Sequence, residues 1–145
     1  MFVSEYKYNF IDLFSGAGGL SEGFFNCNFN PIAHVEMNTY ASETLKTRSC
    51  YYYLKRINQL DIYYDYLRGR ISQQELYDYV PEDVLETVIN LEISDKTYKH
   101  IFEKIDVIMR KDGINSVDLV IGGPPCQAYS LVGLSLIHIS EPTRH

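Results

Sequence analysis

The stretch FIDLFSGAGGLSEGF, residues 10–24, most constrains how this 145-residue chain folds. A short apolar strand, expected over Tyr8–Phe14, runs directly into a glycine-rich turn, and a helix is expected from about Gly19 to Cys27. Glycines permit a tight turn and let a ligand approach the backbone, and the first amide groups of the following helix face that ligand. A strand, a glycine turn and a helix in this order indicate a parallel sheet with a ligand at the turn.

Strand and helix patterns continue to alternate after this unit. A second strand is expected at Pro31–Glu36, a helix at about Thr39–Asn58, and a buried strand at Val117–Ile121. The alternation predicts the α/β class with a doubly wound parallel sheet. Shorter signals lie between these elements. A capping box at Ser72–Glu75 predicts the start of a short helix, and Pro81 suits the first turn of another. A strand-like segment follows at Thr87–Leu91, and Ser94 and Asp95 can cap a helix whose apolar face carries Ile101, Phe102, Ile105 and Ile108.

Composition and charge exclude several classes of protein. No stretch approaches the length of a membrane span, and the N-terminus MFVSEYKYNF lacks the basic start and apolar run of a secretory signal. Cys27, Cys50 and Cys126 show neither CxxC spacing nor an even count. We therefore expect no disulfide framework, no metal site and an intracellular, cytoplasmic location. The net charge of −6 argues against a nucleic-acid partner, because such proteins usually carry a basic face.

The spacing of the turn glycines argues against a dinucleotide ligand. Gly16-x-Gly18 is compact, and no third glycine stands where the pattern GxGxxG requires one. Glu22 also places a negative charge near the start of the helix, where a bound phosphate disfavours it. We therefore expect a cofactor without a pyrophosphate. The alternative is a purely structural turn whose glycines serve packing.

Glu36 ends the second expected strand, about 20 residues beyond the turn glycines. An acidic residue at this strand tip can accept hydrogen bonds from a ribose diol. Alone it could equally be a solvated surface glutamate, but its place after the glycine turn favours ribose binding. The neighbouring Met37 can cover an adenine face or simply pack.

The stretch IGGPPCQAYS, residues 121–130, forms a second turn. Pro124 and Pro125 fix φ and remove two backbone donors, so the turn is rigid and rich in carbonyl acceptors. It sets Cys126 at the carboxyl end of a parallel strand, where α/β proteins bind ligands. A buried structural cysteine needs no such scaffold, whereas a pre-positioned nucleophile does. We predict that Cys126 is a nucleophile, activated by the fold or by the substrate.

Taken together, the two turns resemble the DNA cytosine-5 methyltransferase family. DLFSGAGGLSEGF is similar to that family's first, cofactor-binding motif, and GGPPCQAYS to its catalytic proline-proline-cysteine-glutamine motif. The resemblance is close over residues 10–36 and 117–133 and loose between them. It implies a Rossmann-like S-adenosylmethionine-dependent methyltransferase fold, with residues 1–133 as the N-terminal part of the catalytic domain.

The resemblance also implies roles for individual residues. Cys126 adds to carbon 6 of a cytosine flipped out of the DNA, which makes carbon 5 nucleophilic enough to take the methyl group. Gly123 and Pro124 contact the base, and Gln127 and Ser130 meet the DNA backbone nearby. The implied contacts to S-adenosylmethionine are Phe14, Ser15, Gly16, Gly18, Gly19, Leu20, Glu36, Met37, Glu92, Ile93 and Pro125.

The middle of the chain departs from the family pattern. Members place a short acidic motif, often Asp-Ile, at the third strand tip to hold the adenine. Glu92-Ile93 is our candidate, and Asp61-Ile62 is the rival in a helical stretch. Most of the 13 tyrosines also lie in the middle. We expect a helical, tyrosine-rich insert over about residues 51–90, a solvated outgrowth in the simplest interpretation and a surface for DNA or another part of the enzyme in the alternative.

Several parts that the family needs have no counterpart in this sequence. They are a glutamate in a Glu-Asn-Val context, an arginine-bearing strand, a target recognition domain and a final helix. We therefore expect an N-terminal fragment without turnover, and the absent recognition domain accounts for the acidic net charge. LSLIHISEPTRH, residues 134–145, matches the translation of a transposase sequencing adapter over Leu134–Arg144. We expect this tail to be non-native read-through.

The complete protein implied by the resemblance is a monomeric enzyme of prokaryotic or phage origin that acts on DNA, as in restriction–modification. A tRNA cytosine-5 methyltransferase is one alternative, because that branch uses similar motifs. A dinucleotide-dependent oxidoreductase is another, but the missing third glycine and the PPCQ turn count against it. A non-catalytic, cofactor-binding remnant is the third.

Overall fold

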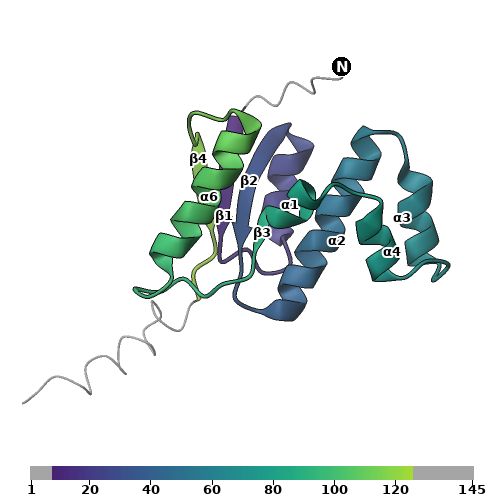
Figure 1. Ribbon diagram of the computed structural model, residues 1–145, viewed down its shortest axis with the longest axis horizontal. Coiled ribbons are helices and arrows are strands. Elements are labelled where there is room, and N and C mark those ends of the chain that lie inside the picture. The colour runs from purple at the N-terminus through teal and green to yellow at the C-terminus, as the bar shows by residue number, and fades with distance from the viewer. Residues whose placement is uncertain (1–7, 126–145) are drawn as a thin grey trace, which may run out of the picture.

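A computed structural model of the chain describes residues 8–125 (Figure 1). Its strands form one parallel sheet in the order β3-β2-β1-β4. They are β1 (Tyr8–Leu13), β2 (Phe29–Val35), β3 (Val88–Ile89) and β4 (Leu119–Gly122). The first strand, β1, lies inside the sheet and later strands lie on both sides of it, as in doubly wound folds.

Helices cover both faces of this sheet (Figure 1). α6 packs on one face, and α1 and α2 lie on the other. The helices of the described residues are α1 (Gly19–Asn26), α2 (Thr39–Arg56), α3 (Leu60–Leu67), α4 (Gln73–Asp78), α5 (Glu82–Glu86) and α6 (Tyr98–Asp112). The predicted α/β class with a parallel, Rossmann-like sheet is therefore confirmed.

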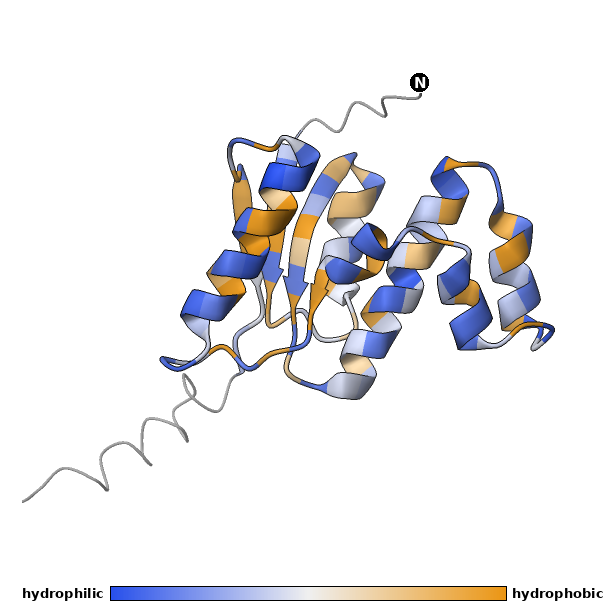
Figure 2. Ribbon diagram, in the orientation of Figure 1, coloured by the Kyte–Doolittle hydropathy of each residue, from blue (hydrophilic) through white to orange (hydrophobic). Residues whose placement is uncertain are grey.

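The face under α6 holds the main apolar core. Ile101, Ile105 and Ile108 are three and four residues apart, so they share one side of the helix, and all are buried. They pack in one cluster with Ile11 of β1 and Val35 of β2. Figure 2 shows this apolar stripe of α6 alternating with polar positions that face solvent.

Two details predicted for α6 were wrong. Phe102 is 59% exposed, because it follows Ile101 and therefore lies about 100° around the helix from the buried stripe. The helix also begins after Thr97 rather than at a cap on Ser94 and Asp95. The Ser94 carbonyl accepts hydrogen bonds from the amides of Thr97 and Tyr98, at 3.1 and 3.0 Å, and so forms a turn ahead of the helix.

The short helices of the insert start at the predicted signals. At α4 the Glu75 amide donates to Ser72 Oγ (3.2 Å) and the Ser72 amide donates to Glu75 Oε2 (2.7 Å), which confirms the capping box. Pro81 caps α5 instead of standing in its first turn, so that prediction was wrong by one position.

The tyrosine-rich segment builds a second, smaller core. α3 and α4 pack against the side of α2 that faces away from the sheet (Figure 1). Cys50 and Leu54 of α2 are fully buried there with Leu76 of α4. The tyrosines packed around this core are Tyr53, Tyr63, Tyr66 and Tyr77. The helical outgrowth is present, but its inner side is apolar rather than solvated.

The edge strand β4 is more open than predicted. β4 pairs with β1, and the register places Gly122 opposite Leu13. An apolar run predicts a strand buried on both faces only where both faces are covered. Val120 is 57% exposed at this edge, so the prediction of a buried strand was wrong.

His34 of β2 is buried among aromatic rings. It is 1% exposed, its ring is stacked on Phe25 at 5.9 Å, and Phe10 meets it edge-on at 6.1 Å. Neither ring nitrogen has a hydrogen-bond partner among the described residues. Burial, with the charge of Arg48 as the smaller cause, lowers the pKa of His34 from 6.5 to about 4.

We expect folding stability to fall as the pH drops from about 6.5 toward about 4. In that range the unfolded chain takes up a proton at His34 and the folded chain does not. The free energy of unfolding should therefore be about 2 kcal/mol lower at pH 5 than at about pH 7.5. Burial raises the pKa of Asp12, which acts in the opposite direction. The measurement is therefore urea unfolding of the unchanged chain and of His34→Phe at both pH values. Phenylalanine suits the aromatic surroundings of this position and does not titrate. Equal pH dependence in both proteins would contradict the expectation.

Candidate cofactor site

A cavity of about 330 Å³ lies at the carboxyl ends of the strands. This is the edge at which open α/β sheets bind their ligands. Segments that follow β1, β2, β3 and β4 meet there, although they are far apart in the sequence. The lining residues are Phe14, Val35, Glu36, Met37, Asn38, Leu91, Glu92, Ile93, Gly123 and Pro125. Most of them are residues predicted for the cofactor or the base.

The glycine turn between β1 and α1 contains three residues with positive φ. Gly16 and Gly18 have φ of 55° and 87°, in the left-handed region that favours glycine. The Ser15 amide donates to the Val35 carbonyl at 3.1 Å and ties the turn to the tip of β2. Phe14 also has a positive φ of 56°, which non-glycine residues rarely adopt. Such backbone strain clusters at ligand sites, and Phe14 lines the cavity.

Glu36 fastens this turn to the tip of β2. Its Oε2 accepts a hydrogen bond from the Gly16 amide at 2.8 Å, and its Oε1 accepts one from the Asn38 amide at 2.7 Å. A carboxylate has about four lone-pair positions, so each oxygen can accept one more donor. The carboxylate is thus fixed in place and retains capacity for two hydroxyl donors, which is what a ribose diol offers.

The remaining turn residues predicted for the cofactor lie at the start of α1. Gly18 caps the helix, and Gly19 and Leu20 open its first turn, with Leu20 50% exposed. Ser15 is buried, and its hydroxyl donates to the Asp12 carbonyl at 2.7 Å. These residues border the turn and are not in the lining of the cavity among the described residues.

Arg48 of α2 is a residue of this region that the sequence analysis missed. Its guanidinium forms an ion pair with Glu22 of α1. The negative charge of Glu22 is thereby paired, so it belongs to the contact between two helices. α2 also approaches the turn closely, because a Cβ at Gly18 would lie 2.9 Å from Leu45 Cδ2 and 3.3 Å from Arg48 Nε. No spacing signal links residues 26 positions apart.

Asp12 was missed as well, although an acidic residue inside an apolar strand is a visible signal. It is fully buried, and Ser21 Oγ donates a hydrogen bond to its Oδ2. Burial is the largest cause that raises the pKa of Asp12, and the Ser21 hydrogen bond opposes it. The contact holds α1 against β1 directly behind the glycine turn.

The structure separates the two candidates for the adenine motif. Glu92 and Ile93 line the cavity at the carboxyl end of β3. Ile62 instead packs into the core of the insert, on α3 with Asp61. This geometry favours Glu92-Ile93, and their role stays a prediction.

The proline turn, residues 121–130, reaches the cavity with its described residues. Gly123 and Pro125 line the cavity, and Pro124 lies between them. Cys126, Gln127 and Ser130 lie outside the described residues. The structure therefore brings the proline turn to the cofactor cavity and leaves the roles of these three residues as predictions.

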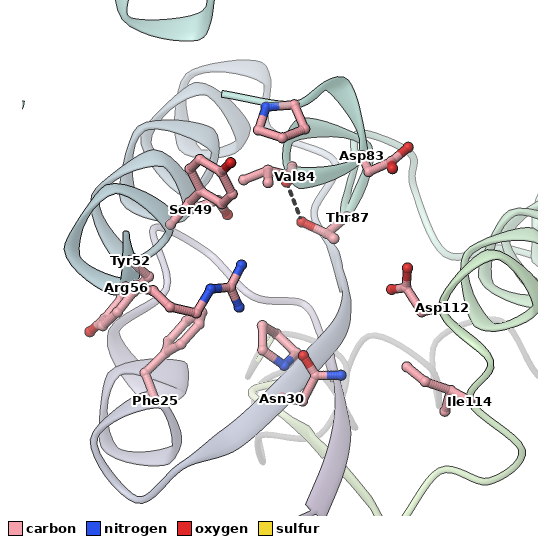
Figure 3. A pocket seen from close by; sticks show the side chains of 13 residues that line it. Phe25, Asn30, Ser49, Tyr52, Arg56, Asp83, Val84, Thr87, Asp112 and Ile114 are labelled. Carbon is pink, nitrogen blue, oxygen red and sulfur yellow. Dashed lines mark hydrogen bonds between the residues drawn. The ribbon is translucent and has the colours of Figure 1, made fainter. Parts of the chain in front are cut away.

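A larger cavity, of about 480 Å³, lies at the opposite end of the sheet (Figure 3). Asn30 and Pro31 at the start of β2 line it, with Arg56 at the end of α2 and Asp112 at the end of α6. Size alone does not identify a functional site. Ligands of open α/β sheets bind at the carboxyl ends of the strands, where the smaller cavity lies.

The described part of the chain holds neither a metal-ligating cluster nor a helix that could span a membrane. Among residues 8–125, no group of three His, Cys, Asp or Glu side chains could hold a metal ion. None of the helices in the same part is both long enough and apolar enough to span a bilayer.

A parallel sheet with a glycine turn and an acidic strand tip at the carboxyl ends of its strands defines an α/β domain of the doubly wound class. Comparison with protein families narrows this class. The model of the C-5 cytosine-specific DNA methylase family matches residues 8–73 and 87–137. The chain belongs to this family, which confirms the resemblance.

Curated relatives agree with this assignment. The chain is 42% identical over 142 residues to "Type II methyltransferase M.Bpa9945I" of Bacillus paralicheniformis, with 86% of this chain and 32% of that protein covered. It is 27% identical over 150 residues to "Type II methyltransferase M1.HphI" of Haemophilus parahaemolyticus, covering 99% of this chain and 29% of that protein. The chain thus spans about a third of the length of these relatives. No solved structure gives a significant match.

Proposed function

We propose that the complete protein transfers a methyl group from S-adenosylmethionine to carbon 5 of cytosine in DNA, with Cys126 as the nucleophile. The observation that carries the proposal is the shared cavity. The acidic tip of β2 and the proline turn that precedes Cys126 line the same space, so cofactor and base would meet there. The names of the relatives support methyl transfer within type II systems.

The residues around the cavity suit this cofactor. Glu36 would accept hydrogen bonds from the ribose hydroxyls, and Met37 and Ile93 offer apolar surface for the adenine. Phe14 and Pro125 close other walls. S-adenosylmethionine, when bound, supplies an electrophilic methyl group. No phosphate site is required, which agrees with the compact glycine turn.

Replacement of Glu36 tests the ribose assignment. Glu36→Gln removes the charge and turns an amide donor toward the Gly16 or Asn38 amide, so we expect cofactor affinity to fall about 10- to 100-fold. Calorimetric titration with S-adenosylhomocysteine measures this. Glu103→Gln on the exposed side of α6 is the control and should bind as the unchanged chain does. Equal affinity in all three proteins would remove Glu36 from the site.

The substrate is tested by labelled-methyl transfer with the longer reading frame recovered from the source DNA. We expect label in cytosine of duplex DNA and none in tRNA. Label in tRNA alone would favour the tRNA branch, and cofactor binding without transfer would favour a non-catalytic role.

We propose that the 145-residue chain is an inactive N-terminal part, with residues 1–133 in the catalytic domain, an insert over about 51–90 and a read-through tail at 134–145. A genomic match through His145 would overturn the tail. We further propose that the complete enzyme is a cytoplasmic monomer.

A further inference from the structure

Asn90 follows β3 directly and lies beside the tip of β2. Its side-chain Nδ2 donates to the Glu36 carbonyl at 2.9 Å and to the Met37 carbonyl at 3.0 Å. Its Oδ1 accepts a hydrogen bond from Thr39 Oγ1 at 3.3 Å. One carboxamide therefore joins the end of β3, the end of β2 and the first residue of α2.

The chemistry of the partners fixes the orientation of this carboxamide. Two carbonyl oxygens can be satisfied only by a donor, so the NH₂ group must face Glu36 and Met37. The oxygen then faces the Thr39 hydroxyl, which can donate. Neither an aspartate, which has no donor when ionised, nor an alanine can make the same three contacts.

The turn that Asn90 holds is the one that aims the Glu36 carboxylate. The Glu36 carbonyl also accepts from Ser42 Oγ at 3.2 Å, and the Glu36 amide donates to the Ile89 carbonyl at 3.1 Å. The side chain of Glu36 then reaches the amides of Gly16 and Asn38. Backbone freedom at Glu36 and Met37 would move the carboxylate away from these amides, since no other side chain bonds the Met37 carbonyl among the described residues.

Asn90 also sets the opposite wall of the cavity. Leu91, Glu92 and Ile93 follow it directly and line the same cavity as Glu36 and Met37. The hydrogen bonds of Asn90 keep this segment beside the β2 tip. Beyond the backbone pairing of β2 with β3, this exposed side chain thus helps to set the distance between the expected ribose and adenine contacts.

We propose that Asn90 is a positioning residue, which holds the Glu36–Met37 turn and the Leu91–Ile93 segment in the arrangement that binds the cofactor. It rests on the proposed function for its cofactor and touches neither the methyl group nor the base. Its effect is on cofactor affinity through the placement of Glu36. Chemical steps at Cys126 are outside its reach.

Amide hydrogen exchange of the 145-residue chain tests the proposal without any ligand. In Asn90→Ala and in the isosteric Asn90→Asp, we expect the Gly16 and Asn38 amides to exchange about tenfold faster or more, because their acceptor is no longer held. The Glu75 amide in the remote capping box is the internal reference and should be unchanged. Asn115→Ala, at an exposed loop position, is the matched control and should leave all three amides unchanged. Unchanged exchange at Gly16 and Asn38 in both Asn90 variants would overturn the proposal.

Titration with S-adenosylhomocysteine separates this proposal from the proposed function. We expect both Asn90 variants to bind about tenfold more weakly than the chain with Asn115→Ala. Equal affinity would overturn the positioning role even if exchange changed. Failure of every protein, including the unchanged chain, to bind would count against cofactor binding by this chain, and the exchange result would still decide whether Asn90 holds the turn.

Discussion

Gly122→Ala is expected to destabilise the chain by about 3 kcal/mol or more, which corresponds to a loss of about 10 °C in Tm. Gly122 ends β4 and pairs with Leu13 of β1. A Cβ at Gly122 would overlap the carbonyl oxygen of Leu13, and that oxygen belongs to the central strand rather than to a flexible side chain. The clash can be relieved only if β4 moves away from β1. Thermal and urea unfolding followed by circular dichroism measure the loss.

The neighbouring glycine provides the matched control. Among the described residues, no atom would lie within 4 Å of a Cβ at Gly123. Gly123→Ala is therefore expected to change the free energy of unfolding by less than about 1 kcal/mol. Similar losses in both variants would mean that backbone freedom, rather than the approach of Leu13, explains the pair of glycines. The first glycine of GGPPC is thus assigned to strand packing and the second to the turn itself.

Local sequence patterns predicted most of the secondary-structure elements. The order of apolar strand, glycine turn and helix from residue 8 to 26 predicted β1 and α1, because each element depends on neighbours in sequence. The capping box at Ser72 succeeded for the same reason. Predictions failed where burial depends on what covers an element. Val120 was predicted to be buried but is exposed at the edge of the sheet. Phe102 was predicted on the apolar face of α6 but lies outside the buried stripe.

The site shows the same division. The place of Glu36 at the tip of β2 could be predicted, because an acidic residue at a fixed interval after the glycine turn is a sequence feature. Arg48 could not, because its ion pair with Glu22 depends on how α2 lies over α1. Asn90 is 54 residues from Glu36, and only the pairing of β3 with β2 brings them together. Residues that hold a site, unlike those that touch a ligand, follow from tertiary contacts.

Cys126→Ser in the complete enzyme is expected to reduce methyl transfer to cytosine by about 1000-fold or more. A thiolate adds readily to carbon 6 of a pyrimidine, whereas a serine hydroxyl is scarcely ionised near neutral pH and adds far more slowly. The prolines at 124 and 125 make the turn before Cys126 rigid, so the loss should appear in kcat rather than in cofactor affinity. Labelled-methyl transfer and S-adenosylhomocysteine titration measure the two quantities. Cys27→Ser, at an exposed cysteine, is the control and should keep full activity.

A cytosine with fluorine at carbon 5 gives the more direct test of the covalent step. In the proposed mechanism, the Cys126 sulfur bonds to carbon 6, and carbon 5 takes the methyl group from S-adenosylmethionine. Release then requires loss of the proton at carbon 5, which restores the ring double bond as the carbon–sulfur bond breaks and the thiolate leaves. Fluorine cannot leave as a proton, so the adduct should persist as a complex of protein and DNA that survives denaturation. The complex should form with the unchanged enzyme and with Cys27→Ser but not with Cys126→Ser. A complex that still forms with Cys126→Ser would place the nucleophile elsewhere, and methyl transfer without any trapped complex would require a mechanism that does not pass through an adduct at carbon 6.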